Sequence, residues 1–320
     1  MGDQESEIED LERVFNTAKA TPIKISYGAL RLITQNFAQV IGSGTFGLVY
    51  LGKLQNGAMI AVKKLSLRIE DISNKKFLDE VDVLRRLNHK NIVRFLGYCA
   101  DTHGEVMDVE GKLRVVEEPQ RLLCFEYAPN GNLHDYIREK SYGFEWHIRY
   151  QIIKGVCQGL SYLHQERINH LDLKPENVLL GPQMVPKITD FGLSRCFVAQ
   201  KSVIFTSNIF GTRGYIAPEL IDNQQISFKT DIYSLGITLV KLLTQSNEIT
   251  ENWHESLEQD CPQMKRCAQI ALSCIKWDPK DRPTIREILD QLDDTETKFR
   301  KVDTAVYEPS KDPESSLYQV

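Results

Sequence analysis

The chain has 320 residues, of which 42% are hydrophobic and 26% charged, and its net charge at pH 7 is −5. This composition is ordinary for a globular protein long enough for two separate cores, and it excludes the broad basic surface of a nucleic-acid-binding protein. The seven cysteines are scattered and include no C-x-x-C pair. That argues against a disulfide framework or a zinc site and indicates a reducing, intracellular compartment.

Residues 1–34 form an acidic segment ahead of the first strands. The opening MGDQESEIEDLERVF lacks the basic start and apolar centre of a signal peptide, and no apolar run in the chain approaches the ~20 residues of a membrane helix. Gly2 and Ser6 fit the N-myristoylation pattern. Because the acidic flank would be repelled by anionic lipid, acylation of Gly2 is the weaker interpretation.

Residues 35–127 show a β-rich pattern. The stretches FAQVI, GLVYLGKL and AMIAVKKL alternate apolar with other residues, and Asn56-Gly57 between the last two predicts a hairpin turn. The stretch 73–87 has helical spacing instead, with Phe77, Val81 and Leu84 on one face and Ser73 as the N-cap. Two further strands follow, IVRFLGYC and RLLCFEY, and the acidic segment between them is expected to be an exposed loop or hairpin.

Residues 128–296 are predominantly helical in pattern. A hinge is expected near residues 128–131, followed by helices in HIRYQIIKGVCQGLSYLH, DIYSLGITLVKLLT, MKRCAQIALSCIKW and TIREILDQLDD. The polar segment 297–320 contains Pro309 and Pro313 and is expected to be a disordered tail. The fold class predicted is therefore α+β, with a small β-rich lobe followed by a larger helical lobe.

A glycine-rich stretch, IGSGTFGLV, places Gly42, Gly44 and Gly47 in a G-x-G-x-x-G-x-V pattern. A dinucleotide-binding fingerprint would lead into a helix, whereas this stretch continues as a strand. A strand–turn–strand of this kind can cover phosphates with its backbone N–H groups. Taken alone, the pattern fits a plain glycine-containing hairpin equally well.

Lys63 alternates with apolar residues in IAVKKL, and Glu80 lies on the buried side of the helix that follows. A buried carboxylate needs a partner, because an unpaired buried charge is costly. We therefore predict that Lys63 and Glu80 pair and that the lysine reaches a phosphate. For Lys63 taken alone, a lysine exposed to solvent would be the default, and neither residue by itself would indicate a function.

The stretch HLDLKPENVLL places Asp172, Lys174 and Asn177 on a loop before a short strand, and Asp190 ends the next strand in VPKITDFGLS. Asp172 is the candidate acceptor of a hydroxyl proton, and Lys174 the candidate that balances charge on a transferring phosphoryl group. Asn177 and Asp190 offer two oxygen ligands, which suits Mg²⁺ because this ion keeps phosphate and water oxygens as its other ligands.

GSGTFGLV, IAVKKL, Glu80, HLDLKPEN, DFG and APE occur in the order of the protein-kinase signature set, so residues 35–295 resemble a protein kinase domain of bilobal fold. The stretches DLKPEN and GTRGYIAPE are similar to the serine/threonine branch. FEYAPNGNLHDYI and HLDLKPENVLL resemble plant receptor-like kinases of the Pelle and interleukin-receptor-associated type, those of grasses in particular.

This resemblance implies roles for more residues. Those implied to bind ATP are Ile41, Gly42, Ser43, Gly44, Thr45, Phe46, Gly47, Val49, Ala61, Lys63, Phe125, Glu126 and Ala128. Phe125 would be the gatekeeper, and backbone groups of Glu126 and Ala128 would bind adenine. Structural roles are implied for His170, Asp231, Glu219 and Arg282, and Thr212 would orient substrate and catalytic loop.

Leu171 departs from the family pattern, because most kinases have an arginine before the catalytic aspartate. That arginine pairs with a phosphate on the activation segment, here residues 190–219, and so orders it. Leucine has no donor, so we expect chemistry without this switch. Ser202, Thr206 and Ser207 remain candidate phosphorylation sites.

The function predicted is a serine/threonine protein kinase that uses ATP and Mg²⁺, with Mn²⁺ as an alternative metal, in cytoplasmic signalling. The expected partners are protein substrates and a membrane receptor or co-receptor kinase, with peripheral association at the plasma membrane as an option. The alternative is a nucleotide-binding pseudokinase scaffold, supported only by Leu171 and by the short segment 245–260.

Overall fold

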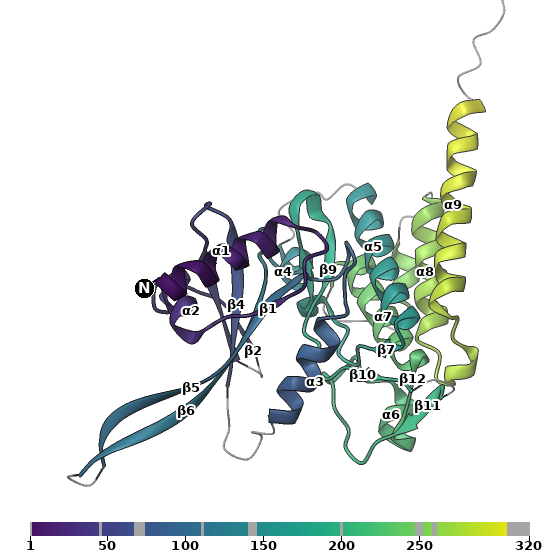
Figure 1. The fold of residues 1–320 in the computed structure, drawn as a ribbon. Coiled ribbons are helices and arrows are strands. Elements are labelled where there is room, and N and C mark those ends of the chain that lie inside the picture. The colour runs from purple at the N-terminus through teal and green to yellow at the C-terminus, as the bar shows by residue number, and fades with distance from the viewer. Residues whose placement is uncertain are drawn as a thin grey trace, which may run out of the picture.

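The computed structural model describes residues 2–44, 47–66, 74–109, 112–139, 146–198, 201–246, 252–257 and 261–305. These residues form two lobes, a small lobe built on a β-sheet and a large helical lobe (Figure 1). The predicted bilobal α+β fold is therefore confirmed.

The small lobe contains one sheet of six strands in the order β1-β5-β6-β4-β3-β2. Its strands and helices are β1 (Ile23–Lys24), β2 (Val40–Gly44), β3 (Gly47–Lys53), β4 (Met59–Leu65), β5 (Phe95–Val109), β6 (Lys112–Glu126), α1 (Gly2–Asn16), α2 (Tyr27–Ile33) and α3 (Asn74–Leu84). Only β1 pairs in parallel, with β5, and the other pairs are antiparallel.

Two hairpins set the shape of this sheet. In the first, between β3 and β4, the side chain of Asn56 accepts from the N–H of Ala58 and Gly57 has a φ of 86°, so the predicted turn is present. The second is the β5–β6 hairpin, which fills the acidic segment expected to be a loop or hairpin. It projects beyond the sheet, because β4 pairs with β6 only between Leu122 and Glu126 (Figure 1).

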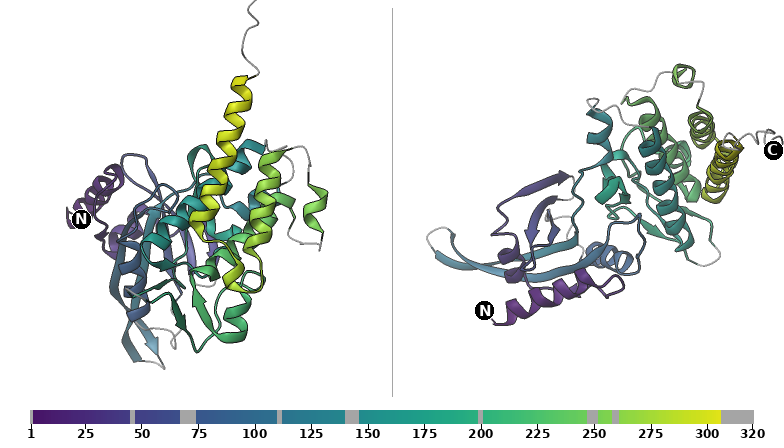
Figure 2. Two further views of the ribbon diagram at one scale, coloured as in Figure 1. Left: turned by 90° about the vertical axis from the view of Figure 1, so that its right-hand side faces the viewer. Right: turned by 90° about the horizontal axis from the view of Figure 1, so that it is seen from above.

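The N-terminal segment packs onto the outer face of this sheet, where α1 lies along the β5–β6 hairpin (Figure 2). Leu11 of α1 and Leu30 of α2 are fully buried in a core that also contains Ile60 of β4 and Leu122 of β6. The alternation of acidic and apolar residues in α1 lets one face enter this core while the carboxylates stay in water. Residues 1–34 were expected only to precede the kinase lobes, and their packing role was not foreseen.

Arg94, between α3 and β5, fastens the end of α1. Its guanidinium donates to the backbone carbonyls of Val14, Phe15 and Thr17, with Nη1 2.8 Å from the carbonyl oxygen of Phe15. The last carbonyls of a helix have no partner within the helix, so a cation at this position satisfies them and complements the helix dipole. The N-terminal segment is thus tied to the small lobe by both apolar packing and charge-assisted hydrogen bonds.

The large lobe packs its helices around a second core. Its helices are α4 (Leu133–Arg138), α5 (Trp146–Gln165), α6 (Pro218–Asn223), α7 (Phe228–Thr244), α8 (Pro262–Cys274) and α9 (Ile285–Ala305). Its short strands and 3₁₀ turns are β7 (Ile168–Asn169), β8 (Val178–Leu180), β9 (Pro186–Ile188), β10 (Arg195–Cys196), β11 (Val203–Phe205), β12 (Gln225–Ser227), η1 (Pro175–Asn177), η2 (Pro182–Met184), η3 (Trp253–Ser256) and η4 (Pro279–Asp281).

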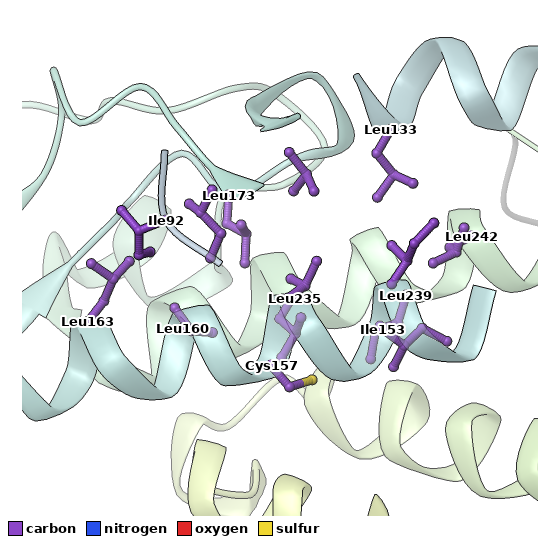
Figure 3. Packing of buried hydrophobic residues seen from close by; sticks show 14 of the residues in the cluster. Ile92, Leu133, Ile153, Cys157, Leu160, Leu163, Leu173, Leu235, Leu239 and Leu242 are labelled. Carbon is purple, nitrogen blue, oxygen red and sulfur yellow. The ribbon is translucent and has the colours of Figure 1, made fainter. Parts of the chain in front are cut away.

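Helices α5 and α7 form the centre of this core. Ile153 and Leu160 of α5 face Leu235 and Leu239 of α7, and all four are buried (Figure 3). Each such side chain contributes about 1.5–3 kcal/mol to folding. Gly159 lets α5 approach both the α3–β5 connection and β9 closely, since a Cβ there would lie 2.7 Å from the carbonyl oxygen of Asn91 and 3.1 Å from the side chain of Ile188. The core thereby positions the loops between β7 and β9, which carry the candidate site.

The last helix extends further than the sequence indicated. α9 continues to Ala305, so residues 297–305 of the expected disordered tail are helical (Figure 1). Residues 306–320 lie outside the described residues, as do Ser73, the expected N-cap of α3, and Thr45 and Phe46 of the glycine-rich stretch.

Candidate active site

The glycine-rich stretch forms the hairpin between β2 and β3 that was predicted as strand–turn–strand. Gly44 pairs with Gly47, and Gly42 pairs with Val49. Gly47 has a φ of 144°, and a Cβ at this position would lie only 2.1 Å from the carbonyl oxygen of Lys64 in β4. A side chain there is therefore excluded by the neighbouring strand, which leaves the backbone of the hairpin uncovered toward a ligand.

Ile41, Ser43 and Val49, which are implied to bind ATP, all belong to this hairpin. Ile41 lies at a register shift between β2 and β3, and Ser43 is exposed opposite Leu48. Val49 pairs with Lys63 across β3 and β4, so the hairpin and the lysine share one end of the sheet. The hairpin therefore lies next to the strand that carries the predicted phosphate-binding lysine.

Lys63 forms an ion pair with Asp190, and its Nζ lies 2.8 Å from Oδ1. Burial alone would lower the pKa of Lys63. The negative charges of Asp190 and Glu80 together raise this pKa by more than burial lowers it, so the net shift is upward. Burial tends to raise the pKa of Asp190, yet Lys63 and its hydrogen bond hold that pKa below its usual value. Both groups of the pair are therefore charged at neutral pH.

Glu80 lies on the buried side of α3, as predicted, and is 9% exposed. Its pKa is raised, chiefly by burial, while Lys63 acts to lower it and Asp190 to raise it. Lys63 and Glu80 thus interact through their charges, beside the ion pair of Lys63 with Asp190. A direct Lys63–Glu80 contact stays a prediction.

Asp172 is the centre of a hydrogen-bond network in the candidate catalytic loop, residues 170–177. Its Oδ1 accepts from the hydroxyl of Thr212 at 2.7 Å, and its Oδ2 accepts from Asn177 Nδ2 and pairs with Lys174 Nζ, both at 3.0 Å. Lys174 Nζ also donates to Thr212 Oγ1 at 2.5 Å. Although Asp172 is only 5% exposed, both oxygens have partners, so the carboxylate is fixed in direction.

Asn177 and Asp190 are the candidate metal ligands. The amide nitrogen of Asn177 is committed to Asp172, to its backbone carbonyl at 2.8 Å and to its carboxylate, which leaves the amide oxygen for a cation. The Asn177 carbonyl accepts from the N–H of Thr189 at 3.0 Å, so the loop is tied to the residue before Asp190. An amide oxygen and a carboxylate fit Mg²⁺, because this ion binds oxygen ligands and takes only a few of them from the protein. Within the described ranges, no three His, Cys, Asp or Glu residues gather into an alternative metal site.

Asp231, at the start of α7, holds the backbone of the candidate catalytic loop. This carboxylate is fully buried and accepts from the N–H groups of His170 at 2.9 Å and Leu171 at 2.8 Å. It also contacts Nε2 of His164 on α5 at 3.1 Å. The role of His164 was missed in the sequence, where it appeared only as part of a helical stretch.

The ring of His170 is fixed by two hydrogen bonds. Its Nδ1 accepts from the N–H of Asp172 at 3.2 Å, so the proton must lie on Nε2, which donates to the carbonyl of Thr189 at 2.9 Å. The ring also packs edge-on against Phe191, with centroids 5.2 Å apart. His170 thus joins the candidate catalytic loop to the segment that carries Asp190, which agrees with its implied structural role.

Glu219 and Arg282 form a buried bidentate pair in the large lobe. Nη1 and Nη2 of the arginine lie 2.8 and 2.7 Å from Oε1 and Oε2 of the glutamate. Further donors of Arg282 bond the carbonyls of Lys229, Lys276 and Trp277. With all donors satisfied, this pair fixes the end of the activation segment to α7 and the turn before α9.

The wall expected to contact adenine lies where β4 and β6 pair. Ala61 faces Phe125, which is buried and packs against Phe95 with ring centroids 5.5 Å apart. The N–H of Glu126 donates to the carbonyl of Arg94 at 3.0 Å. The N–H of Glu126 is therefore already bonded, and its carbonyl is the backbone group of this residue that remains a candidate to bind adenine. The backbone groups of Ala128 also remain candidates.

The side chain of Glu126 links the two lobes. Its Oε1 accepts from the N–H of Arg94 at 2.8 Å and pairs with Lys187 at 2.8 Å, and Lys187 also donates to the carbonyl of Lys90. This link was not foreseen, since Lys187 has no motif that marks it in the sequence. It connects the hinge to the β8–β9 hairpin behind the candidate site.

The candidate phosphorylation sites lie on the outer part of the activation segment. Ser202 and Ser207 are exposed, and Thr206 Oγ1 donates to the carbonyl of Asn208 at 3.0 Å. By contrast, Leu171 is 5% exposed and lies under this segment. The position that carries arginine in most kinases is therefore occupied by part of an apolar contact.

The comparisons with known proteins agree with this geometry. Residues 36–292 match the family model described as protein kinase domain. The chain belongs to the protein kinase family. It is 33% identical to cysteine-rich receptor-like protein kinase 27 of Arabidopsis thaliana over 89% of this chain and 46% of that protein. It is also 33% identical to G-type lectin S-receptor-like serine/threonine-protein kinase SD2-5 of the same plant, over 91% of this chain and 37% of that protein.

This kinase chain spans less than half the length of the curated relatives it matches. The predicted protein kinase domain is therefore confirmed, and both relatives are named as receptor-like kinases. In the part of the chain that the structure describes, no helix combines the length and apolar character that a membrane span requires.

Proposed function

We propose that this kinase domain transfers the γ-phosphoryl group of ATP to serine and threonine hydroxyls of protein substrates. The observation that carries the proposal is the convergence of Asp172, Lys174, Asn177 and Thr212 in one network, beside the Lys63–Asp190 pair. Phosphoryl transfer needs positioning and charge stabilisation more than covalent chemistry, and these residues supply both.

The residues would share the reaction as follows. Asp172 receives the hydroxyl proton of the substrate, and the hydrogen bonds from Thr212 and Asn177 hold its carboxylate in direction. Lys174, 3.0 Å from Asp172, neutralises charge on the phosphoryl group as it moves. Lys63 binds phosphate oxygens of ATP from the other side.

Asn177 and Asp190 would hold Mg²⁺, which supplies charge neutralisation between the phosphates when it is bound. Because Lys63 keeps the pKa of Asp190 below its usual value, this carboxylate is ionised and able to act as a ligand at neutral pH. Mn²⁺, which also accepts oxygen ligands, is an alternative at the same residues.

Finer assignments belong to the same proposal. The resemblance to kinases of the Pelle and interleukin-receptor-associated type supports a place in signalling from a membrane receptor or co-receptor kinase, with a cytoplasmic or membrane-peripheral location. Acylation of Gly2 remains the weaker expectation. Gly2 is the first residue of α1, so an acyl group would be attached at the start of a helix packed on the small lobe.

The test is transfer of radiolabelled phosphate from ATP by the purified chain, to itself and to a generic basic protein substrate. We expect transfer with Mg²⁺ and none with a chelator. Replacing Lys63 with Met should lower transfer by at least about 100-fold, because the phosphates lose a charged ligand. ATP binding by the intact chain without any transfer would favour the pseudokinase scaffold instead.

A further inference from the structure

Leu171 belongs to a separate apolar cluster beneath the activation segment. Its buried members are Leu171, Phe197, Leu220 and Ile226, and Ile204, Phe210, Ile216 and Phe228 pack against them. Phe197 and Ile204 come from the outer part of the activation segment, whereas Leu220 and Ile226 come from α6 and β12. An arginine at position 171 would place its charged side chain among these apolar side chains, at the cost of burying a charge.

Two small strand pairs connect the activation segment to the rest of the large lobe. β10 pairs with β7, with Cys196 opposite Ile168, and β11 pairs with β12, with Ile204 opposite Ile226. Each pair has only two or three residues per strand, which is too short to be stable by itself. Other contacts must therefore keep the segment between these pairs in place.

Arg167 makes such contacts from the residue just before β7. Its Nε donates to the carbonyl of Phe197 at 3.5 Å, and its Nη2 donates to the carbonyls of Val198, at 3.3 Å, and Lys201. In return, the N–H of Phe197 donates to the carbonyl of Arg167 at 2.8 Å. One guanidinium thus bonds Phe197 and Val198, just after β10, and Lys201, just before β11.

The backbone conformation and the ring contacts of Arg167 keep its side chain in a fixed position. Its φ is 60°, in the left-handed region that a non-glycine residue adopts only when its surroundings hold it there. Its guanidinium carbon also lies 5.8 Å from the ring centre of Phe228, which itself packs against Phe197 with centroids 4.8 Å apart. The side chain is therefore held between the first residue of α7 and the activation segment.

We propose that Arg167 is a positioning residue that keeps the activation segment in its ordered conformation without phosphorylation. It binds three backbone carbonyls in place of the phosphate that an arginine at position 171 would bind, and the apolar cluster around Leu171 completes the contact. The proposal rests on the proposed kinase function, and it concerns how that function is regulated.

The part of the activation segment that Arg167 holds is connected to the reacting residues through Gly211 and Thr212. Gly211 packs closely on Leu171, since a Cβ at Gly211 would lie 3.1 Å from the carbonyl oxygen of Leu171. The next residue, Thr212, donates to Asp172 at 2.7 Å. A displaced activation segment would therefore move Thr212 away from Asp172 and distort the surface on which a protein substrate lies, while the ATP-binding residues of the small lobe would be unaffected.

The experiment compares Arg167→Ala and Arg167→Lys with the unmodified chain. Arg138→Ala is the matched control, because this arginine is largely exposed and forms an ion pair with Asp135 on the surface. All four proteins are treated with a phosphatase, and kcat and KM are measured for ATP and for the protein substrate. Hydrogen exchange is followed in peptides that contain Phe197 and Thr206, whose N–H groups bond to Arg167 and Gln224.

We expect the unmodified chain to remain active after dephosphorylation. Arg167→Ala should lower kcat/KM for the protein substrate by about tenfold and leave KM for ATP within about twofold, because charge-assisted hydrogen bonds are lost only on the activation segment. Exchange at Phe197 should become about tenfold faster. For Arg167→Lys, both kcat/KM for the protein substrate and the exchange rate at Phe197 should lie between those of the unmodified chain and Arg167→Ala. An ammonium group cannot span three carbonyls as a planar guanidinium does.

Two results would overturn the proposal. One is loss of transfer by the unmodified chain on dephosphorylation, and the other is equal exchange in Arg167→Ala and Arg138→Ala. To separate this from failure of the kinase proposal, exchange is repeated in Asp172→Asn, in which phosphate transfer is expected to be about 10²–10⁴-fold slower. Faster exchange on adding Arg167→Ala to Asp172→Asn would support the positioning role of Arg167 even if the unmodified chain transferred no phosphate. Unchanged exchange in that double variant would overturn this role.

Discussion

The candidate catalytic loop and the N-terminal segment are both packed tightly, but by different forces. Asp172 of the loop and Asp231 of α7, which holds the loop backbone, are buried carboxylates whose oxygens accept hydrogen bonds from defined donors. In the N-terminal segment, Leu11 and Leu30 are buried among other apolar side chains. The first region is specified by individual polar atoms and the second by volume and apolar character.

This difference separates chemistry from stability. A carboxylate in the loop cannot be exchanged for another group without losing its donors or its charge, so its identity is dictated by the reaction. A leucine in the outer core of the small lobe could be replaced by another apolar side chain of similar size at small cost. Substitutions in the two regions should therefore have opposite consequences for catalysis and for folding.

The largest expected effect is that of Asp172→Asn on catalysis. Asparagine has nearly the same shape but cannot accept the substrate proton, so kcat should fall by about 10²–10⁴-fold. The free energy of unfolding should change by no more than about 1 kcal/mol, since removal of the charge also removes the cost of burying it. Steady-state kinetics and urea unfolding of the same preparations measure the two quantities.

The matched control for this substitution is Asp293→Asn, in which an exposed carboxylate of α9 paired with Lys154 is neutralised. Its kcat and stability should stay close to those of the unmodified chain. If Asp172→Asn instead lost stability in proportion to activity, the network around Asp172 would be a structural feature and the comparison of the two regions would break down.

The N-terminal segment gives the reverse prediction. Leu11→Ala removes a fully buried side chain from the outer core and should lower the free energy of unfolding by about 2–3 kcal/mol. The kcat should be unchanged at temperatures where the variant is folded, because the catalytic network is in the other lobe. Urea unfolding curves and kinetics at about 20 °C, well below a typical domain's Tm, measure these effects.

Leu32→Ala is the control for this change, because Leu32 belongs to α2 of the same segment but is 56% exposed. Its stability should lie within about 0.5 kcal/mol of the unmodified chain. Equal stability of the Leu11 and Leu32 variants would mean that α1 contributes nothing to the core in solution.

The sequence was most informative where chemistry demands a residue type at a fixed spacing. The spacing within HLDLKPEN and DFG led to Asp172, Asn177 and Asp190, and the helical period led to the burial of Phe77, Val81 and Leu84. The small β-rich lobe and the large helical lobe were also predicted, from the change near residue 128 between strand-like alternation and helical spacing of apolar residues. These features are local, so a short window of sequence contains most of their cause.

The contacts that could not be foreseen join distant residues to backbone atoms. Arg94 and Arg167 each bind three carbonyls of another segment, and a carbonyl has no signature in a sequence. The packing of α1 was missed for a related reason. Its acidic residues suggested a solvated segment, and the burial of its apolar face depends on a sheet assembled from residues far along the chain.

The smallest expected effect is a difference in thiol reactivity between the two lobes. Cys99 and Cys124 are buried in the outer core of the small lobe, whereas Cys157, Cys267 and Cys274 are buried in the large lobe. Burial raises the pKa of all five thiols, to about 12 for Cys99 and Cys274. Exposed Cys196 should therefore react first with a thiol reagent near pH 8, because only thiolates are nucleophilic.

Leu11→Ala should accelerate labelling of Cys99 and Cys124 by several-fold and leave the large-lobe cysteines unchanged, because α1 would detach locally more often. The pH dependence identifies the route. A thiol exposed by opening regains an ordinary pKa of about 8.5, so its rate should level off above about pH 9. A rate for Cys99 that rose steadily toward pH 12 would show that the reagent reaches the thiol within the folded lobe. Equal acceleration in both lobes would mean that the two cores open together, which would contradict the independence of the N-terminal packing from the lobe that carries Asp172.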